Sequence, residues 1–455
     1  MGDAGHLNSM NDTNYEETLN RVIEKALAAG ATSADASMDR SRGVDVTVRE
    51  GKLETIERDE STGVSLRCFV GQRQAHVSGS DLSADGLEAL VDRCVSMAKI
   101  APEDQYAGIA APEELARDLP EIELWGDDPV EPEVLEAEAI EAEAAARAVP
   151  GIKDVPGSGS SWSAGEVWLA ASNGFRAHKS SSLSGVGLSA IAERDGVMER
   201  DYESYTSRRR IDRPTPAEIG RVAGERTIAR LGAQKIDSQK AAVFYDKRVS
   251  ASLIGAFIGA ISGAAIARGT SFLKDKLGEQ VFANGIELID DPFRAFGMGS
   301  RRFDGEGRPV QVTKIVEDGR LTTWLLNGPS ARQLGLKPNG FASPGFGDPP
   351  GISVSNMHMP AGSQSPEELI SSVGKCLQVT EMFGPSINPN TGDYSVGVSG
   401  IWHDGEGNSF PVSEITVADN LIEMFKRLVP ASDLEFRNRT NTPGLLVEGM
   451  TIAGR

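Results

Sequence analysis

The sequence predicts an α+β fold that is rich in antiparallel strands. Two observations support this class: alternating apolar and polar segments follow one another through short turns with a helix at each end, and the 50 glycines and 23 prolines are typical of many tight turns. A chain of 455 residues is also too long for one compact core. We predict N-terminal antiparallel sheet units flanked by helices, and a C-terminal strand-rich domain, barrel-like or with a mixed sheet, that contains a buried Gly/Ala-rich helix. The predicted boundaries are 15–100 for the first unit, 101–132 for an acidic, Pro-rich linker, 133–235 for the second unit and 236–455 for the C-terminal domain.

The first unit has the pattern of an antiparallel meander between two helices. A helix is predicted from about Tyr15 to Ala29, because apolar residues recur on one face. Alternating segments follow, and Glu50-Gly51 and Gly71-Gln72 have the composition of tight turns. A second helix is predicted to begin after Ser83, which can cap its first turn.

The second unit begins with an acidic, Ala-rich helix that we predict over Glu133 to Arg147. Hairpins are predicted at Asn173-Gly174 and Asp195-Gly196, since both dipeptides suit two-residue turns. The helix that closes the unit has a marked start. Thr215 is the predicted N-cap, and Glu218 three residues later is predicted to complete a capping box.

The C-terminal domain is predicted to begin with a strand over Ala241 to Tyr245 and a helix over Val249 to Ala267. Gly255, Gly259 and Gly263 lie four residues apart in this helix, a spacing also found in packed membrane helices. The segment has few bulky apolar residues, so we predict a buried helix pressed against a sheet rather than a membrane span. Hairpin turns are further predicted at Asp304-Gly305, Asp318-Gly319 and Asp404-Gly405, and short helices over 366–373 and 420–428.

The composition excludes several classes of protein. A formal net charge of −20 disfavours direct nucleic-acid binding, because that binding requires cations that neutralise phosphates. Arg208 to Arg210 form the one dense basic cluster, which we interpret as a solvated strand end, with a surface for an anionic partner as the less favoured alternative. Cys68, Cys94 and Cys376 are odd in number and indicate free thiols in a reducing compartment. Met1 to Thr13 lack the apolar segment of a signal peptide, so we expect a cytoplasmic protein that binds neither membrane nor nucleic acid.

Histidine placement argues against a helical zinc site, because no histidine is followed by Glu and no two are close in sequence. His403, Asp404 and Glu406 lie together and are candidates for a cation site or for an unrecognised hydrolase site. Asp304-Gly305-Glu306-Gly307 repeats the same turn without a histidine, so we favour a plain hairpin turn at 403–406.

Other catalytic templates give weaker signals. There is no G-x-S-x-G nucleophile turn and no phosphate-binding glycine loop. We interpret His358 as a packed strand residue rather than a ligand. Glu279 and Asp290 are candidates for the lining of a cleft, although no spacing supports that role.

Six short motifs occur in order along the C-terminal domain. Their combination resembles the TldD/PmbA family, formerly labelled modulator of DNA gyrase, and more closely its PmbA branch, also called TldE. The resemblance extends from about Leu19 to Gly454. The motifs are R-G-T-S-F-L at 268–273, G-E-Q-V at 278–281, G-M-G-S at 297–300, T-G-D-Y-S at 391–395, P-V-S-E-I-T at 411–416 and M-T-I-A-G at 450–454.

The resemblance also implies which residues would have held a metal. In the catalytic branch of the family, a helix before the Arg-Gly-Thr-Ser segment carries H-E-x-x-x-H, and a cysteine near the C-terminus adds a zinc ligand. Counting back from Arg268 places the two histidine positions at Ile254 and Gly259 and the glutamate position at Gly255. The cysteine position falls near Pro443. The resemblance therefore implies a chain without catalytic residues, cofactor or metal of its own, with zinc in a catalytic partner.

Family membership further implies a non-catalytic subunit of a heterodimeric metallopeptidase that degrades or processes unfolded peptides. The expected partner is a TldD-like paralogue with the H-E-x-x-x-H motif, and a homodimer is the alternative when that partner is absent. An exposed edge strand would hold an extended peptide by strand addition. Two other hypotheses are an independent hydrolase that uses His403, Asp404 and Glu406, and a binding protein of a topoisomerase or toxin–antitoxin system.

Overall fold

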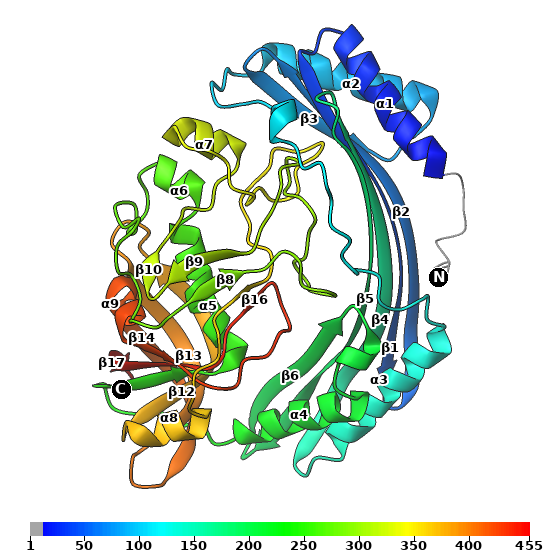
Figure 1. Ribbon diagram of the computed structural model, residues 1–455. Coiled ribbons are helices and arrows are strands. Elements are labelled where there is room, and N and C mark those ends of the chain that lie inside the picture. Colours follow the sequence, from blue (N-terminus) through cyan, green and yellow to red (C-terminus); the bar gives the residue numbers. More distant parts are fainter. Residues whose placement is uncertain (1–11) are drawn as a thin grey trace.

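The computed structural model describes residues 12–455. Residues 1–11, which hold most of the segment where we predict no signal peptide, lie outside the described residues. The α+β prediction is confirmed. Figure 1 shows a long curved sheet on one side of the molecule, with the strand-rich C-terminal domain against its concave side. None of the helices in the described residues has the length and apolar character that crossing a membrane requires.

One six-stranded antiparallel sheet forms the N-terminal half of the molecule, in the order β3-β2-β1-β4-β5-β6. The two predicted N-terminal units share this sheet, because β1 pairs with β4 from Asp35 opposite Ala171 to Val48 opposite Ser158. This pairing between strands far apart in the sequence makes the two units one layer. The strands are β1 (Ser33–Arg49), β2 (Lys52–Val70), β3 (Arg73–Gly79), β4 (Ile152–Ala171), β5 (Arg176–Arg194) and β6 (Val197–Ser207).

The predicted tight turns of this sheet are confirmed. Glu50-Gly51 joins β1 to β2 with φ of 53° and 68°, and Asp195-Gly196 joins β5 to β6 with φ of 54° and 81°. Positive φ at both central residues is the type I′ geometry that matches strand twist. Gly71-Gln72 joins β2 to β3, and Asn173-Gly174 lies in the connection from β4 to β5.

Four helices cover one face of the sheet, two near each end. Ala36 and Val46, both even-numbered residues of β1, pack against the helices, whereas Ser37 and Asp39 face the C-terminal domain. The opposite face is therefore free to form the contact with that domain. The helices are α1 (Asp12–Ala28), α2 (Ala84–Ile100), α3 (Pro132–Arg147) and α4 (Pro216–Ala229).

The start of α4 differs in one detail from the prediction. The Thr215 side chain accepts a hydrogen bond from the Glu218 amide at 3.2 Å, which confirms the N-cap. The Glu218 carboxylate pairs with Arg221 at 2.6 Å and does not reach back to Thr215. The predicted capping box is therefore wrong, because a nearby arginine takes the carboxylate that would have completed it.

The segment between α2 and α3 runs across the boundary between the sheet and the C-terminal domain. Its backbone makes hydrogen bonds on both sides, from Ser182 N to Leu124 O at 3.2 Å and from Phe296 N to Glu123 O at 2.8 Å. Apart from one short 3₁₀ helix at Pro112–Glu114, this segment lacks regular structure. It acts as a strap that fixes the two parts of the molecule to each other.

The C-terminal domain contains a closed five-stranded barrel in the order β14-β13-β12-β7-β17, and a pairing between β14 and β17 closes the ring. β7 and β12 are parallel and the other neighbours are antiparallel. This confirms the barrel-like prediction. The strands are β7 (Gln239–Tyr245), β12 (Cys376–Ile387), β13 (Asp393–His403), β14 (Ser409–Asn420) and β17 (Leu445–Ala453), with β15 (Leu428–Pro430) beside β17.

A smaller five-stranded sheet packs beside the barrel. The Asp318-Gly319 turn joins β9 to β10 as predicted. Asp304-Gly305 does not lie between two strands, so that hairpin prediction is wrong; a single bridge between Phe303 and Pro309 closes the turn. The strands of this sheet are β8 (Leu288–Asp290), β9 (Thr313–Glu317), β10 (Arg320–Leu321), β11 (Met357–His358) and β16 (Thr440–Asn441). Three short helices of the C-terminal domain are α7 (Gly328–Leu334), α8 (Pro366–Ser372) and α9 (Leu421–Arg427).

Two further predictions concern side chains. Cys68, Cys94 and Cys376 are free and buried, as predicted. Arg208 is also buried, and its guanidinium donates to the carbonyl oxygens of Gly297 and Leu124, each at 3.2 Å. The interpretation of this arginine as part of a solvated strand end is therefore wrong, because the end of β6 is covered by the C-terminal domain and the strap.

Candidate functional site at helix α5 and the edge of strand β6

Helix α5 (Lys247–Ala260) carries the positions that the resemblance assigns to zinc ligands. Its first turn is capped by Asp246, whose side chain accepts a hydrogen bond from the Arg248 amide at 3.0 Å. Leu253, Ile254 and Phe257 bury one face of the helix in the core of the C-terminal domain. The helix is thus fixed by its apolar face, and its other face is free for other contacts.

The prediction of one continuous helix over 249–267 is wrong. α5 ends at Ala260, and a separate short helix, α6 (Gly263–Ala267), follows. Leu325 accounts for the break: its amide donates to the Ile261 carbonyl at 3.1 Å, and its carbonyl accepts from the Gly263 amide at 2.8 Å. These bonds to a neighbouring segment take backbone groups that a continuous helix would use internally.

The three glycines of this segment have different surroundings. A β-carbon placed at Gly255 or Gly259 would meet no atom within 4 Å, whereas one at Gly263 would lie 2.6 Å from Ser330 Oγ and 2.9 Å from Leu325 O. Only Gly263 therefore permits a close approach. The prediction that the glycines press the helix against a sheet is wrong for Gly255 and Gly259, which lie on the exposed face.

The counted zinc positions offer no group that fits zinc. Ile254 is an aliphatic side chain that is fully buried, and Gly255 and Gly259 have no side chains. Ile254 faces the core, whereas Gly259 faces outward. Neither a ligand set nor a general base is present at these three positions.

The counted cysteine position lies close to the same helix. Pro443 is buried, and its neighbour Thr442 shares a hydrogen bond of 2.6 Å with Ser250, which lies one turn before Ile254 in α5. The structure therefore brings together the helix and the C-terminal segment that the resemblance paired. Proline adds no thiolate to this place.

Strand β6 runs beside α5 and is an edge strand of the N-terminal sheet. Two cavities, of about 210 Å³ and about 240 Å³, lie along its free side. Both contact Arg248 of α5, and the second also reaches Thr442. The counted zinc helix and a free sheet edge thus border the same space.

Two arginine–carboxylate pairs cover the middle of the β6 edge. The amides of Tyr202 and Ser204 donate to the Asp201 and Glu203 carboxylates at 2.7 and 3.0 Å. The carbonyl of Tyr202 accepts from Arg248 at 3.4 Å, and that of Ser204 accepts from Arg437. Asp201 and Arg248 are ion-paired at 2.8 Å, as are Glu203 and Arg437. Side chains therefore take the backbone groups that an added strand would use.

The charges of these pairs are stable at neutral pH. Burial opposes ionisation of Asp201, but the hydrogen bond and charge of Arg248 outweigh it and hold the pKa of this carboxyl below its ordinary value. Burial likewise opposes ionisation of Glu203, but Arg437 and Arg226 hold its pKa below the ordinary value. Both carboxylates are buried, so the pairs are shielded from solvent screening.

His403, Asp404 and Glu406 do not converge on one point. His403 Nε2 lies 3.1 Å from Gln378 Oε1, and Asp404 Oδ1 accepts from the amides of Glu406 and Asn408 at 2.7 and 3.1 Å. The Asp404 carboxylate therefore closes its own turn, and this confirms the interpretation of 403–406 as a hairpin turn between β13 and β14.

The remaining candidate residues lie apart from one another. His358 packs in β11 against Phe436, with ring centroids 5.1 Å apart, as predicted for a strand residue. Glu279 is exposed, whereas Asp290 is buried and accepts from the Ser355 amide at 2.7 Å. Burial raises the pKa of Asp290 to about 6. Within residues 12–455, histidine, cysteine and acidic side chains nowhere gather in a group of three that could hold a metal ion.

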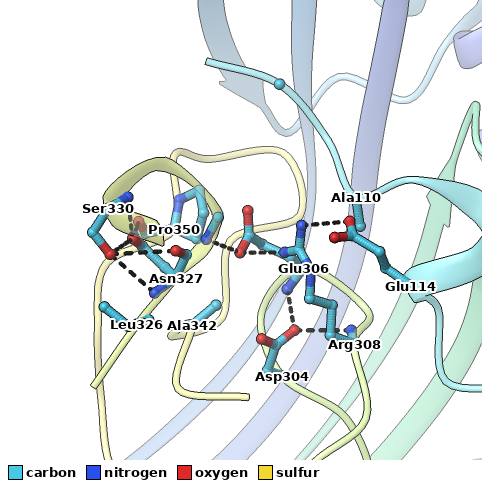
Figure 2. A network of polar contacts seen from close by, with 12 residues as sticks. Ala110, Glu114, Asp304, Glu306, Arg308, Leu326, Asn327, Ser330, Ala342 and Pro350 are labelled. Carbon is cyan, nitrogen blue, oxygen red and sulfur yellow. Dashed lines mark hydrogen bonds and ion pairs between the residues drawn. The ribbon is translucent and has the colours of Figure 1, made fainter. Parts of the chain in front are cut away.

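A buried charge network lies at the boundary between the two parts of the molecule (Figure 2). Arg308 lies between Glu306 at 2.6 Å and Glu114 of the strap at 2.9 Å. Glu306 also accepts from the Gly328 amide at 2.6 Å, at the start of α7. Asp304 accepts from the amides of Glu306 and Arg308, each at 2.9 Å. This network ties the Asp304–Gly307 turn to the strap.

Three domain families match consecutive parts of the chain. The PmbA/TldA metallopeptidase domain 1 matches residues 34–98, the central domain of the same family matches 125–231, and its C-terminal domain matches 238–454. The chain belongs to the PmbA/TldD family. Family membership agrees with the resemblance carried by the C-terminal motifs.

Relatives of this family match over nearly the whole chain. The metalloprotease PmbA of Escherichia coli O157:H7 is 32% identical over 443 residues, 97% of this chain and 96% of its own length. A PmbA homologue of Haemophilus influenzae is 30% identical and covers 96% of each chain. The chain is thus a metallopeptidase-like protein of the PmbA/TldD family.

Solved structures share the fold. A Bacteroides thetaiotaomicron protein described as a modulator of DNA gyrase has a TM-score of 0.88 at 25% identity, and covers 98% of this chain and 100% of its own. TldE from Thermococcus kodakarensis has a TM-score of 0.81 at 18% identity, over 96% of this chain and 100% of its own. At this lower identity the likeness concerns the fold alone.

Sequence reasoning missed the residues that cover the β6 edge. Arg248 and Asp201 are 47 positions apart, and Arg437 and Glu203 are 234 positions apart. No local pattern connects such pairs. The one usable signal was the acidic alternation of Asp201 and Glu203 on a predicted strand, which places both carboxylates on one face.

Proposed function

We propose that this chain is the supporting, metal-free subunit of a two-subunit peptidase in which zinc belongs to a paralogue with the H-E-x-x-x-H motif. The observation that supports the proposal is that the counted zinc positions on α5 have no zinc-binding side chains. In a chain whose relatives are named metalloproteases, the counted ligand positions are Ile254, Gly255 and Gly259, and none has a metal-binding side chain.

The substrate that suits this arrangement is an unfolded peptide. Such a peptide binds in extended form by adding a strand to a sheet edge, and β6 is the edge that borders α5. The Tyr202–Ser204 part of this edge is occupied by Arg248 and Arg437. Strand addition at that part of β6 would therefore require both arginines to withdraw.

The buried free thiols of Cys68, Cys94 and Cys376 suit a reducing environment, and we propose a cytoplasmic location on that ground. The paired subunit is expected to be a chain of the same fold. Two copies of this chain are the alternative assembly when the paralogue is missing.

Peptide cleavage by separate and mixed subunits tests the proposal. Each purified chain is incubated with an unfolded casein substrate, alone and together, and cleavage is followed by mass spectrometry. We expect no cleavage by this chain alone, and cleavage by the mixture that is lost when the paralogue carries Ala in place of its motif glutamate. Cleavage by this chain alone that is abolished by His403→Ala would instead support the independent hydrolase.

A further inference from the structure

A cavity of about 500 Å³ lies between the inner face of the N-terminal sheet and the loops of the C-terminal domain. Its walls include apolar side chains from both parts, among them Leu169, Phe303 and Phe346. Its size falls within the usual range for pockets that bind small organic molecules, about 300–1,000 Å³. Its lining contains no residue of α5 or β6, although Met298 lines both this cavity and the cavity of about 240 Å³ beside β6.

Five cationic side chains line this cavity, although the protein as a whole is strongly acidic. Within residues 12–455, none of the five forms an ion pair with a carboxylate. Asp39, Asp304 and Asp348 also line the cavity, which leaves a small excess of positive charge. The five cations are Lys179, Arg208, Arg301, Arg302 and Arg439.

Three of these cations have structural partners. Arg208 and Arg301 donate to backbone carbonyls, for example from Arg301 to Ser353 O at 2.9 Å, and Arg302 donates to His178 O. Lys179 and Arg439 have no hydrogen-bond or ion-pair partner among the described residues. Burial and the neighbouring charges of Arg439 and Arg301 lower the pKa of Lys179. Lys179 is half-buried and Arg439 is exposed, so both cationic groups can be reached by an anion that enters the cavity.

The contrast with the adjacent charge network shows that this lack of pairing is local. Arg308 follows the Asp304–Gly307 turn directly and is paired with both Glu306 and Glu114 (Figure 2). The same turn contributes Asp304 and Gly305 to the cavity itself. Arg308 is thus neutralised by two carboxylates, whereas none of the five cations that line the cavity forms an ion pair among residues 12–455.

We propose that this cavity binds the terminal carboxylate of a short peptide, with Lys179 and Arg439 as the groups that recognise the charge. The lining has more cations than carboxylates, so it favours an anion, and its apolar walls favour a peptide carboxylate over free phosphate, which has no apolar part. The apolar walls fit the side chains next to the carboxylate. This proposal rests on the proposed function, because it takes a peptide as the ligand and gives that peptide a second binding place on the same protein.

Binding of matched peptides to the intact purified chain tests the proposal. The probe is an N-acetylated Ala-Leu-Phe tripeptide with a free C-terminal carboxylate, compared by calorimetry with its C-terminal amide and with inorganic phosphate. We expect the acid to bind at least about ten-fold more tightly than the amide, and phosphate not to displace it. Equal binding of acid and amide, no binding of either, or displacement by phosphate would overturn the proposal.

Single-residue variants test whether Lys179 and Arg439 bind the peptide carboxylate. Lys179→Met and Arg439→Gln should each weaken binding of the acid by about ten-fold or more and leave binding of the amide unchanged. Lys314→Met, an exposed lysine of β9, is the matched control and should change neither. Because Lys179 has no partner, Lys179→Met should leave the unfolding temperature unchanged or raise it. A lowered unfolding temperature would show a structural role for this lysine and contradict the proposal.

The binding assay also separates this site from the proposed subunit role, because it needs neither a partner nor cleavage. Preference for the acid without partner-dependent cleavage would sink only the subunit role. Partner-dependent cleavage without preference for the acid would sink only the cavity proposal.

Discussion

The same four residues, Asp-Gly-Glu-Gly, form two turns in this protein with the same backbone hydrogen bonds to the aspartate and different surroundings. In the turn at 304–307, Asp304 accepts from the amides two and four residues later, and in the turn at 404–407, Asp404 does the same. Asp304 and Glu306 are buried against the strap, whereas Asp404 is half-buried and Glu406 is exposed at the end of a barrel hairpin. Local sequence therefore sets the turn, and tertiary packing sets what its carboxylates do.

The two turns differ in electrostatics as a result. Burial, together with the charge of Glu306, raises the pKa of Asp304 to about 6. The hydrogen bonds from the Asn408 side chain and from the Glu406 amide lower the pKa of Asp404. One motif thus yields two carboxyls whose pKa values move in opposite directions.

The largest expected effect comes from truncating the glutamate of each turn. Glu306→Ala removes one partner of the buried Arg308 and the acceptor of the Gly328 amide, so it should lower the free energy of unfolding by about 3–5 kcal/mol. Glu406→Ala should change it by less than about 0.5 kcal/mol, because this side chain is exposed. Urea unfolding followed by tryptophan fluorescence measures both. Similar losses for the two variants would contradict the assigned difference in burial.

The pH dependence of stability should differ in sign between the turns. Between pH 4 and pH 6, folded Asp304 is protonated while the unfolded carboxyl is ionised, so its contribution falls as the pH rises, by about 3 kcal/mol in total. Asp404 contributes stability above its unfolded pKa that is lost as the pH falls through its lowered folded pKa. The two contributions are measured by comparing the thermal unfolding of Asp304→Asn and of Asp404→Asn with that of the wild type from pH 3 to pH 7. If the difference in stability between Asp304→Asn and the wild type does not change from pH 4 to pH 6, the raised pKa assigned to Asp304 is contradicted.

The glycines of α5 and α6 extend the comparison at a smaller scale. Gly255→Ala and Gly259→Ala fill open space inside a helix, so each should raise the free energy of unfolding by about 0.5–1 kcal/mol. Gly263→Ala is the matched control and should be destabilising, because its β-carbon would press on Ser330 and Leu325. Thermal unfolding measures all three. If Ala at Gly255 or Gly259 lowers the free energy of unfolding, the open space assigned to these two positions is contradicted.

Sequence patterns were sufficient where a feature depends on neighbouring residues. The turns at Glu50-Gly51 and Asp195-Gly196 and the cap at Thr215 follow from steric and hydrogen-bonding preferences of the residues themselves. The barrel-like nature of the C-terminal domain also followed from its strand content.

Features that depend on distant partners were not predictable. The pairing of β1 with β4, the break at Ile261 caused by Leu325 and the covering of the β6 edge by Arg248 and Arg437 all join segments that are far apart in sequence. The capping-box prediction was wrong for a local reason, because Arg221, three residues later in the same helix, pairs with the Glu218 carboxylate. The counted zinc positions were placed by family resemblance, and no periodicity of the helix would have indicated them.

Zinc retention by the purified chain tests the central claim most directly. The chain and its H-E-x-x-x-H paralogue are each incubated with excess zinc, passed through a desalting column and measured by elemental analysis. Since Ile254, Gly255, Gly259 and Pro443 supply no ligand, this chain should retain no more zinc than a metal-free control protein, and the paralogue should retain about one zinc per chain. One tightly held zinc per molecule of this chain would contradict the account.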